Sequence, residues 1–307
     1  VSCSSCGEVM KCPHCDVSLS EHKGGRLICH YCGYTQPMPK LCPKCGSKYI
    51  LGFKAGTQQI EEKLKELYPG VRTLRMDADT TRTKDSYEKI LSSFANGEAD
   101  VLIGTQMIVK GHDFPKVTLV GILAADLSLN ASDYRAGERT FQLLTQAVGR
   151  AGRGVLPGEA VIQTYQPDHY AITCAAAQDY ESFYQEEILY RELSGYPPVA
   201  HMLAVQIYGK EEENVKQLAL RLTDVVKSNM DFLSGKQKEQ SNKKIQVLGP
   251  APANISKIND IYRYVFYVKH AEYDVLVEVK DRLEETLRQW QPRQMSIQFD
   301  FDPVSVL

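Results

Sequence analysis

The chain has 307 residues, of which 43% are hydrophobic and 24% are charged, an ordinary globular composition that suits two or three domains. Its 36 lysines and arginines against 38 aspartates and glutamates give a formal net charge of −2, which excludes a wholly basic nucleic-acid coat protein but not a local basic patch. No run of about 18 apolar residues predicts a membrane span, and no signal segment opens the chain. We therefore expect a cytosolic protein and, because Val1 is not a start methionine, a fragment of a longer one.

Eight of the nine cysteines form four Cys-x-x-Cys pairs near the start of the chain. Two intervening residues let a tight turn direct both thiolates at one ion, and Zn²⁺ prefers four such ligands in a tetrahedron. A disulfide framework would suit a short secreted domain, and redox-active pairs or buried thiols are less consistent with four evenly built pairs. We therefore predict a zinc-binding domain over residues 1–48 that holds two Zn²⁺ ions.

Two ways of joining the cysteine pairs stay open. The segment between the second and third pairs resembles a β-hairpin, with strands at 17–19 and 26–28 and a turn at 23–25 that contains two glycines. A hairpin brings the inner pairs together, which favours a nested arrangement over a sequential one. The nested prediction gives site 1 and then site 2 the following ligands: Cys3, Cys6, Cys42 and Cys45, then Cys12, Cys15, Cys29 and Cys32.

Three further residues bear on this interpretation. His14 and His30 lie within the cysteine pairs and could ligate a metal, but the cysteines already fill both sites, so we expect them to be exposed turn residues. Cys174 stands alone in an apolar stretch at 171–177, where we expect it to pack as part of a helix.

From residue 49 the pattern changes to strands that alternate with helices, which implies a parallel sheet with right-handed crossovers. The continuous apolar run at 117–123 is typical of a strand buried on both faces. We predict one doubly wound domain over residues 49–167, with helices at 57–68, 83–94 and 138–150 and strands at 71–76, 100–104, 117–123 and 160–164.

A Q-x-x-G-R-x-G-R pattern near the end of this domain is specific. On a helix, Gln146 and Arg150 are four residues apart and share a face, and Arg153 follows three residues later. Gly149 and Gly152 would let another surface approach closely. Two fixed guanidinium groups beside small residues suit a polyphosphate; the alternative is a salt-bridged helix end.

At these residues the sequence resembles the second RecA-like lobe of superfamily 2 helicases. The closer resemblance is to the PriA family of replication-restart helicases, and it extends from Val1 to the end of the chain. One departure is minor, since Ala147-Val148 stands where that family usually has Val-Ala. After the zinc pairs, the resemblance rests on the segments 56–58, 75–81, 104–107, 111–115, 196–198 and 300–303.

This resemblance implies roles for individual residues. Arg150 and Arg153 would approach the γ-phosphate of ATP held on a first lobe, where an arginine finger contributes roughly 10³–10⁵ in rate, and Gln146 would help to couple the lobes. The predicted contacts with the DNA backbone, which position DNA without reading bases, are Thr57, Thr105 and Gln106. The predicted nucleotide contacts are Gly111 and Asp113. Asp113 has the alternative role of capping a turn.

The phosphate-binding half of an ATPase is absent from this sequence. The sequence contains no P-loop motif G-x-x-x-x-G-K-[ST], and it contains no Asp-Glu-x-His or Asp-Glu-x-Asp motif that could bind Mg²⁺. We therefore expect ATP and Mg²⁺ to bind only together with a first helicase lobe, and this chain alone to hydrolyse no ATP.

The last third begins with a predicted helical linker at 168–198, whose helix at 179–193 ends before Pro197 and Pro198. The order that follows over residues 199–307 is β-α-β-β-α-β, which predicts a small α+β domain of ferredoxin-like type. Its expected strands lie at 202–208, 246–248, 261–268 and 295–301, and its expected helices at 211–233 and 273–290.

A lysine-rich loop over 234–257 lies beside a strand rich in tyrosine. Lysines for phosphates and aromatic rings for stacking would suit single-stranded or branched DNA; a solvated loop beside a strand whose tyrosines pack in the core is the alternative. The DNA contacts predicted here are Lys236, Lys243, Lys244 and Arg263.

The fold class predicted is α/β, with a zinc-ribbon-like module of two Cys₄ sites, a RecA-like second lobe and an α+β domain. The resemblance implies the carboxy-terminal part of an ATP-dependent 3′→5′ DNA helicase of the bacterial cytoplasm, acting at the nucleoid on abandoned forks and on single-stranded DNA. Its implied partners are the single-stranded-DNA-binding protein and the primosome and helicase-loader proteins.

Two other functions are weighed against this one. A non-catalytic zinc-ribbon and α+β module could bind nucleic acid and protein without ATP, as the absent P-loop would predict for a complete protein, whereas the arginine motif favours a helicase. A superfamily 2 motor of the RecQ or RecG kind shares the arginine motif, but two Cys₄ sites ahead of the lobe argue against it.

Overall fold

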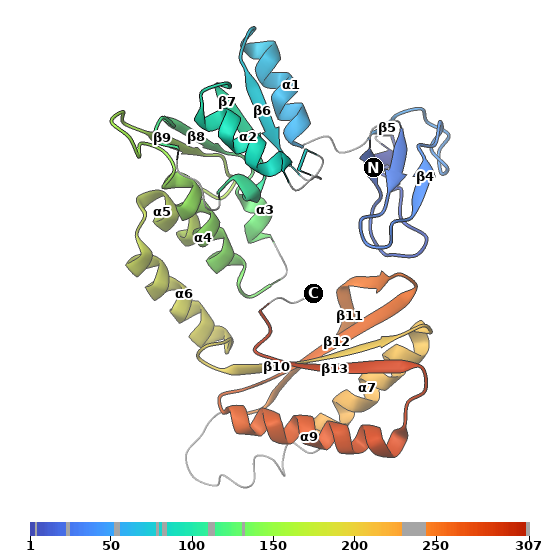
Figure 1. The fold of residues 1–307 in the computed structure, drawn as a ribbon. Coiled ribbons are helices and arrows are strands. Elements are labelled where there is room, and N and C mark those ends of the chain that lie inside the picture. The colour runs from blue at the N-terminus through green and yellow to red at the C-terminus, as the bar shows by residue number, and fades with distance from the viewer. Residues whose placement is uncertain are drawn as a thin grey trace. The chain divides into compact units, whose positions relative to one another are not determined.

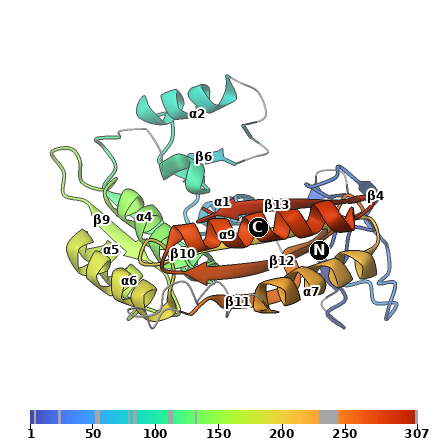
Figure 2. The ribbon, with the colours of Figure 1, turned by 90° about the horizontal axis from the view of Figure 1, so that it is seen from below.

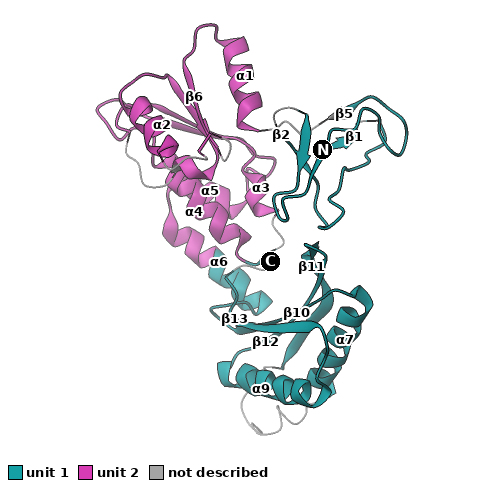
Figure 3. Cartoon of the chain, turned by 45° about the vertical axis from the view of Figure 1, so that its right-hand side comes forward, with its two compact units in different colours: residues 1–52, 132–134, 187–307 teal, residues 53–131, 135–186 magenta. Residues whose placement is uncertain are grey.

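The structure is a computed structural model that describes residues 1–3, 5–22, 25–51, 56–77, 80–81, 85–109, 114–130, 133–228 and 244–304. The chain divides into two compact units (Figure 3). Unit 1 consists of Val1–Gly52, Ser132–Tyr134 and Glu187–Leu307, and unit 2 consists of Phe53–Ala131 and Arg135–Glu186. Among the described residues, no helix has both the length and the apolar character needed to cross a membrane.

The first 51 residues, called the zinc module below, contain very short strands. β1 (Ser2–Cys3) pairs with β5 (Ile50–Leu51), and β2 (Ser20–His22), β3 (Arg26–Ile28) and β4 (Thr35–Pro37) form a three-stranded antiparallel sheet. The antiparallel pairing of the predicted hairpin is confirmed, although its first strand begins at residue 20 rather than 17. The preceding residues instead pair back onto the second cysteine pair, where the N–H of Cys12 donates to the carbonyl of Val17. Residues 23 and 24 of the predicted turn lie outside the described residues.

Unit 2 alternates helices with parallel strands, as predicted. β6 pairs with β7 and β8 with β9, each in parallel. The elements are α1 (Thr57–Leu67), β6 (Thr73–Met76), α2 (Ser86–Ala95), β7 (Val101–Gly104), the 3₁₀ helix η1 (Gln106–Val109), β8 (Leu119–Ile122), α3 (Asp126–Leu129), α4 (Ala136–Val148), β9 (Glu159–Ile162), α5 (Tyr170–Ala177) and the first part of α6 (Tyr180–Ser194).

In the described parts of the chain, the four strands pair as two two-stranded parallel sheets, β6-β7 and β8-β9. One sequence prediction for unit 2 is wrong. The apolar run at 117–123 is not buried on both faces, since Leu119 is 62% exposed and Leu123 55% exposed. The physical reason is one-sided packing: Ile122 packs with Phe141 and Leu144 of α4, while residues 119 and 121 alternate to the other face.

A buried carboxylate ties α3 to the segment after β9. The Asp126 carboxylate accepts hydrogen bonds from the hydroxyl of Thr164 (2.6 Å) and the N–H of Tyr165 (3.0 Å). These bonds, led by that of Thr164, lower the pKa of Asp126 although desolvation acts to raise it. α5 follows, and Cys174 packs there against the core, as predicted.

The C-terminal domain has the predicted order β10 (His201–Gly209), α7 (Glu212–Ser228), β11 (Gln246–Ile258), β12 (Ile261–His270), α9 (Tyr273–Trp290) and β13 (Met295–Phe301). Its antiparallel sheet has the strand order β11-β12-β10-β13, and both helices lie on one face of it (Figures 1 and 2). Leu203, Phe266 and Leu222 are fully buried between the layers, because both helices present apolar residues at three- and four-residue spacing to the sheet.

β11 is much longer than predicted, because it extends to Ile258 rather than ending at Leu248. Its pairing with β12 is interrupted between Leu248 and Ala251 and again between Pro252 and Lys257. Proline cannot donate to a ladder and is tolerated on an edge strand or at a bulge, and β11 is at the edge of the sheet.

A buried ion pair within α6 also holds the segment that follows the helix. The Arg191 guanidinium donates twice to Glu187 Oε1, at 2.8 and 2.7 Å, and once to the carbonyl of Pro197 at 2.8 Å. Both side chains are 8% exposed. Alongside them, the Tyr196 ring stacks on Tyr134 with ring centroids 5.0 Å apart.

Replacing Arg191 by alanine should therefore leave the Glu187 carboxylate buried without its cation. We expect Arg191→Ala to lower the free energy of unfolding in urea by about 3–5 kcal/mol. Arg288→Ala is the control, because Arg288 is 79% exposed and its ion pair with Glu284 is long, at 3.6 Å, so it should cost well under about 1 kcal/mol. Equal losses in the two variants would contradict this reading of the pair.

Candidate functional site

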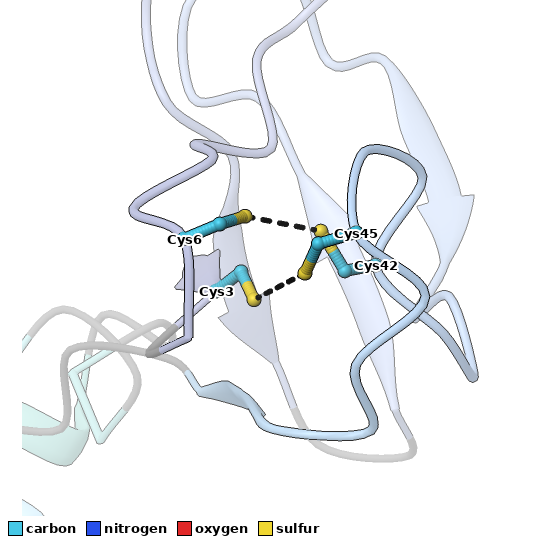
Figure 4. A group of neighbouring side chains, drawn as sticks. All are labelled: Cys3, Cys6, Cys42 and Cys45. Carbon is cyan, nitrogen blue, oxygen red and sulfur yellow. Dashed lines mark hydrogen bonds between the residues drawn. The ribbon is translucent and has the colours of Figure 1, made fainter.

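Two groups of four cysteines lie in the zinc module. Within each group, the sulfur atoms all lie within 4.8 Å of one another. Figure 4 shows the first group, in which the sulfurs of Cys3 and Cys45 and those of Cys6 and Cys42 are 3.7 Å apart. The structure thus brings the cysteines together in the nested arrangement: Cys3, Cys6, Cys42 and Cys45, then Cys12, Cys15, Cys29 and Cys32.

These separations fit a tetrahedral zinc site. Four sulfurs at about 2.3 Å from one ion are about 3.8 Å from each other, and in the second group Cys12 and Cys32 are 3.6 Å apart. A disulfide would need about 2.05 Å, and all the cysteines are free thiols. The two Cys₄ groups therefore support zinc binding.

Three of the four cysteine pairs are followed by the same kind of glycine turn. Gly7, Gly33 and Gly46 follow their pairs at φ of +76°, +76° and +71°, a left-handed conformation that favours glycine. Each donates its N–H to the carbonyl of the first cysteine, at 2.8–2.9 Å. The second pair has Asp16 at this position, and the Asp16 N–H donates instead to the carbonyl of Lys257 in β11.

One thiol in each group ionises more readily than a free cysteine. Burial acts to raise the pKa of Cys3, but backbone N–H groups of Ser5 and Cys6 and the Cys45 thiol lower it to about 6. The pKa of Cys29 is lowered in the same manner, to about 7. Because a metal binds the thiolate, each group offers an ionised ligand near neutral pH.

The predicted exposed histidine His14 does not belong to either cysteine group. Its Nδ1 lies 2.7 Å from Asp260 Oδ2, in the C-terminal domain. His30 is exposed, as expected.

We expect the chain to bind two zinc ions, one for each cysteine group. Cys6→Ser and Cys32→Ser should each lower the zinc content to about one ion per chain, because each removes one of four ligands. Cys174→Ser should leave the content unchanged. Atomic absorption on the purified variants measures this, and an unchanged content in both ligand variants would show that the metal is held elsewhere.

The arginine motif lies at the end of α4, where the structure differs from the predicted helix 138–150. α4 ends at Val148. The N–H of Arg150 donates to the carbonyl of Ala147, three residues back, so Arg150 lies on a turn just past the helix. Arg153 is exposed and donates from Nε to the carbonyl of Gly149 at 2.6 Å, while Gln146 is an exposed residue of the last helical turn.

The glycines after α4 are required by close packing within unit 2. A Cβ on Gly158 would lie 2.1 Å from the nitrogen of Gly152, and one on Gly154 would lie 2.1 Å from the carbonyl oxygen of Pro115. Gly152 also has a φ of +69° and donates its N–H to Val117 beside β8. This packing fixes the backbone that carries Arg150 and Arg153.

Gly158→Ala should therefore destabilise unit 2 by about 1–3 kcal/mol, the usual cost of overpacking. Gly121→Ala in β8 is the matched control, since a Cβ there meets nothing within 4 Å. Urea unfolding of the two variants measures the difference. The interpretation fails if the control loses as much stability as Gly158→Ala.

The residues predicted to contact a DNA backbone gather at one edge of the β6–β7 sheet. Met76 pairs with Gly104 at the carboxyl ends of these strands, and Thr105 and Gln106 follow there as exposed residues. Thr57, at the start of α1, donates its hydroxyl to Asp77 just past β6. Gly111 and Asp113, the predicted nucleotide contacts, lie outside the described residues.

The structure separates the candidate DNA contacts of the C-terminal domain. Arg263 pairs across β10–β12 with Tyr208, and its guanidinium is 5.7 Å from that ring. Lys244 is exposed before β11, at the other end of the sheet from Arg263, and Lys236 and Lys243 lie outside the described residues. Arg263 lines a groove of about 420 Å³ with Tyr31, Tyr208, Asn254, Ile255, Ile258 and Ile261.

One contact was missed by the sequence analysis, which placed Lys257 in a lysine-rich loop suited to DNA. Lys257 lies in β11, and its Nζ donates to the carbonyl of Pro13 in the zinc module at 2.9 Å. The available signal was the Asn259-Asp260 dipeptide between two isoleucines, which is typical of a tight hairpin turn.

Three family models match successive parts of the chain. "PriA DNA helicase Cys-rich region (CRR) domain" matches residues 12–37, "Helicase conserved C-terminal domain" matches residues 41–155, and "Primosomal protein N C-terminal domain" matches residues 192–304.

Curated relatives match along the chain as well. "Replication restart protein PriA" of Bacillus subtilis (strain 168) is 42% identical over 309 residues, covering 100% of this chain and 37% of that protein. The proteins of the same name from Synechocystis sp. and Chlamydia muridarum are 39% and 42% identical, covering 100% and 88% of this chain and 36% and 35% of theirs. The chain thus spans about a third of the length of these relatives.

Proposed function

Because the chain belongs to the PriA family of replication restart proteins, we propose that it is the carboxy-terminal part of an ATP-dependent 3′→5′ DNA helicase. In this proposal, unit 2 is the second RecA-like lobe, and ATP and Mg²⁺ bind between it and a first lobe. The whole protein binds stalled or abandoned forks, unwinds them and helps to reload the replicative helicase.

The observation that carries this proposal is the placement of the arginine motif. Gln146, Arg150 and Arg153 lie within a few residues of one another on a backbone held by the contact between Gly152 and Gly158. Arg150 and Arg153 would stabilise the charge that develops on the γ-phosphate. The bond from Arg153 to the carbonyl of Gly149 is exposed, so it costs little to exchange for a phosphate oxygen.

DNA would lie along the carboxyl ends of β6 and β7 in unit 2. Thr57, Thr105 and Gln106 at the β6–β7 edge are polar, uncharged side chains of the kind that contact phosphate oxygens without reading bases. In unit 1, the groove beside Arg263 offers a cation and two tyrosine rings, Tyr31 and Tyr208, a combination that suits stacked bases of single-stranded DNA. Lys236, Lys243 and Lys244 would add charge for a branched duplex.

We further propose the partners and location that fit such a protein. It would work in the bacterial cytoplasm, on the nucleoid, together with the single-stranded-DNA-binding protein and the primosome and helicase-loader proteins. Zinc would serve the structure of the zinc module rather than the chemistry of ATP, since four cysteines leave no open coordination position.

The test is ATP turnover in the full-length protein that contains this chain. Arg150→Ala should lower DNA-stimulated turnover by about 10³-fold or more and change DNA affinity only a few-fold. Arg72→Ala is the control in the same unit, because Arg72 forms an exposed ion pair with Asp100; it should leave turnover within about twofold.

Two outcomes would overturn the proposal. If Arg150→Ala turns over ATP like the control, the motif does not act on nucleotide. If the unmodified full-length protein shows fork binding without any ATP turnover, the chain is a non-catalytic zinc-ribbon and α+β binding module.

A further inference from the structure

The β11–β12 hairpin touches the zinc module at the cysteine pair that lacks a glycine. The hairpin turns at Asn259 and Asp260, whose φ values are +51° and +59°. Backbone bonds run in both directions across the contact: the Asp16 N–H donates to Lys257, and the Asp260 N–H donates to His14, each at 2.9 Å.

Side chains reinforce the same contact. Ser256 donates its hydroxyl to the Asp16 carboxylate at 2.9 Å. Lys257 Nζ reaches the carbonyl of Pro13, and His14 lies 2.7 Å from Asp260. Ile258 packs against the apolar residues of the zinc module. The hairpin is thus seated on the turn that presents Cys12 and Cys15.

One bond of this contact reaches a candidate metal ligand directly. The N–H of Asn259 donates to Cys15 Sγ at 3.2 Å, and Cys15 is 1% exposed. Hydrogen bonds of this kind, from outside the ligand set, orient a ligand and tune the metal. In the other three cysteine pairs, the N–H of the following glycine donates to the first cysteine. In this pair, the Asp16 N–H donates instead to the carbonyl of Lys257 in β11, and Cys15 Sγ accepts from the Asn259 N–H.

We propose that the β11–β12 turn is the outer shell of zinc site 2, and that zinc in this site couples the zinc module to the C-terminal domain. A zinc-bound thiolate is an ionised acceptor, and hydrogen bonds to ionised acceptors are roughly twice as strong as neutral ones. Zinc in site 2 therefore strengthens docking of the hairpin, and by linkage the docked hairpin holds zinc in site 2 more tightly. We expect no such dependence for site 1, whose two cysteine pairs accept from the N–H groups of Gly7 and Gly46.

This inference rests on zinc occupancy, which is part of the proposed function. The zinc sites and the coupling fail in different ways. A chain that binds no zinc refutes the zinc sites. A chain that binds two zinc ions, both released at rates that depend equally on the hairpin, refutes only the coupling.

The first test changes the turn and spares every cysteine. Asn259→Val disfavours the left-handed conformation that presents the N–H, whereas Asn259→Gly keeps both the conformation and the donor. In a chelator-driven release assay, Asn259→Val should lose one of its two zinc ions about tenfold faster than the unchanged chain, and Asn259→Gly should not. Equal release from the two variants would overturn the proposal.

The second test measures amide hydrogen exchange in the hairpin turn of variants that each lose one zinc site. Amide hydrogen exchange at Asn259 and Asp260 should be at least about tenfold faster in Cys32→Ser, which disables site 2, than in Cys6→Ser, which disables site 1. Equal exchange in the two variants, whether slow or fast, would show that docking does not depend on site 2 in particular.

Lys257→Ala supplies a third variant that replaces neither a turn residue nor a ligand. It removes the bond to Pro13 and the 3.8 Å ion pair with Asp260, and it should accelerate release of the same zinc ion that Asn259→Val affects. Lys216→Ala on α7, where the lysine is half exposed and 3.9 Å from Glu213, is its matched control and should leave both release rates unchanged. Parallel behaviour of the two lysine variants would count against the coupling.

Discussion

The zinc module depends for its order on eight sulfur atoms. Its strands are two or three residues long, and its buried apolar residues other than cysteine are few, chiefly Met10, Leu19, Leu27 and Ile50. So small a core does not offset the conformational entropy of about fifty residues. Where metal binds such a segment, its binding free energy is folding free energy. The surface on which the β11–β12 hairpin packs therefore exists only as long as the sulfur groups are held together.

Much of the fold could be predicted, because hydrophobic period is a local property of the sequence. α9 was predicted at Tyr273–Trp290, and β10, β12 and β13 within two residues of their ends. β11 was not, because Gly249, Pro250 and Pro252 resemble a loop in the sequence, and only its place at the edge of the sheet makes these residues acceptable there.

The candidate sites divide in the same way. The nested cysteine grouping was predictable, because the pairs and the hairpin between them lie close in sequence. The end of α4 was not, since the turn at Arg150 is set by packing of Gly152 on Gly158. The contact between His14 and Asp260 joins residues 246 positions apart, and no local pattern reports a partner at that distance. The buried Asp126 carboxylate was missed because its hydrogen-bond partner Thr164 lies far along the chain, beyond β9.

The order of the two units along the chain has a consequence for biosynthesis. Unit 1 is interrupted by unit 2, so the second cysteine pair is translated early while Lys257 and Asn259 emerge only after the whole of unit 2 has been made. Domains generally fold as they leave the ribosome, the N-terminal one first. The surface of the nascent zinc module that contacts the hairpin therefore stays uncovered until Lys257 and Asn259 have been made. Bringing these residues to the second cysteine pair closes a long loop, which is a slow, non-local step. In cells short of zinc, thiols of the nascent module that hold no metal would be open to oxidation during that interval.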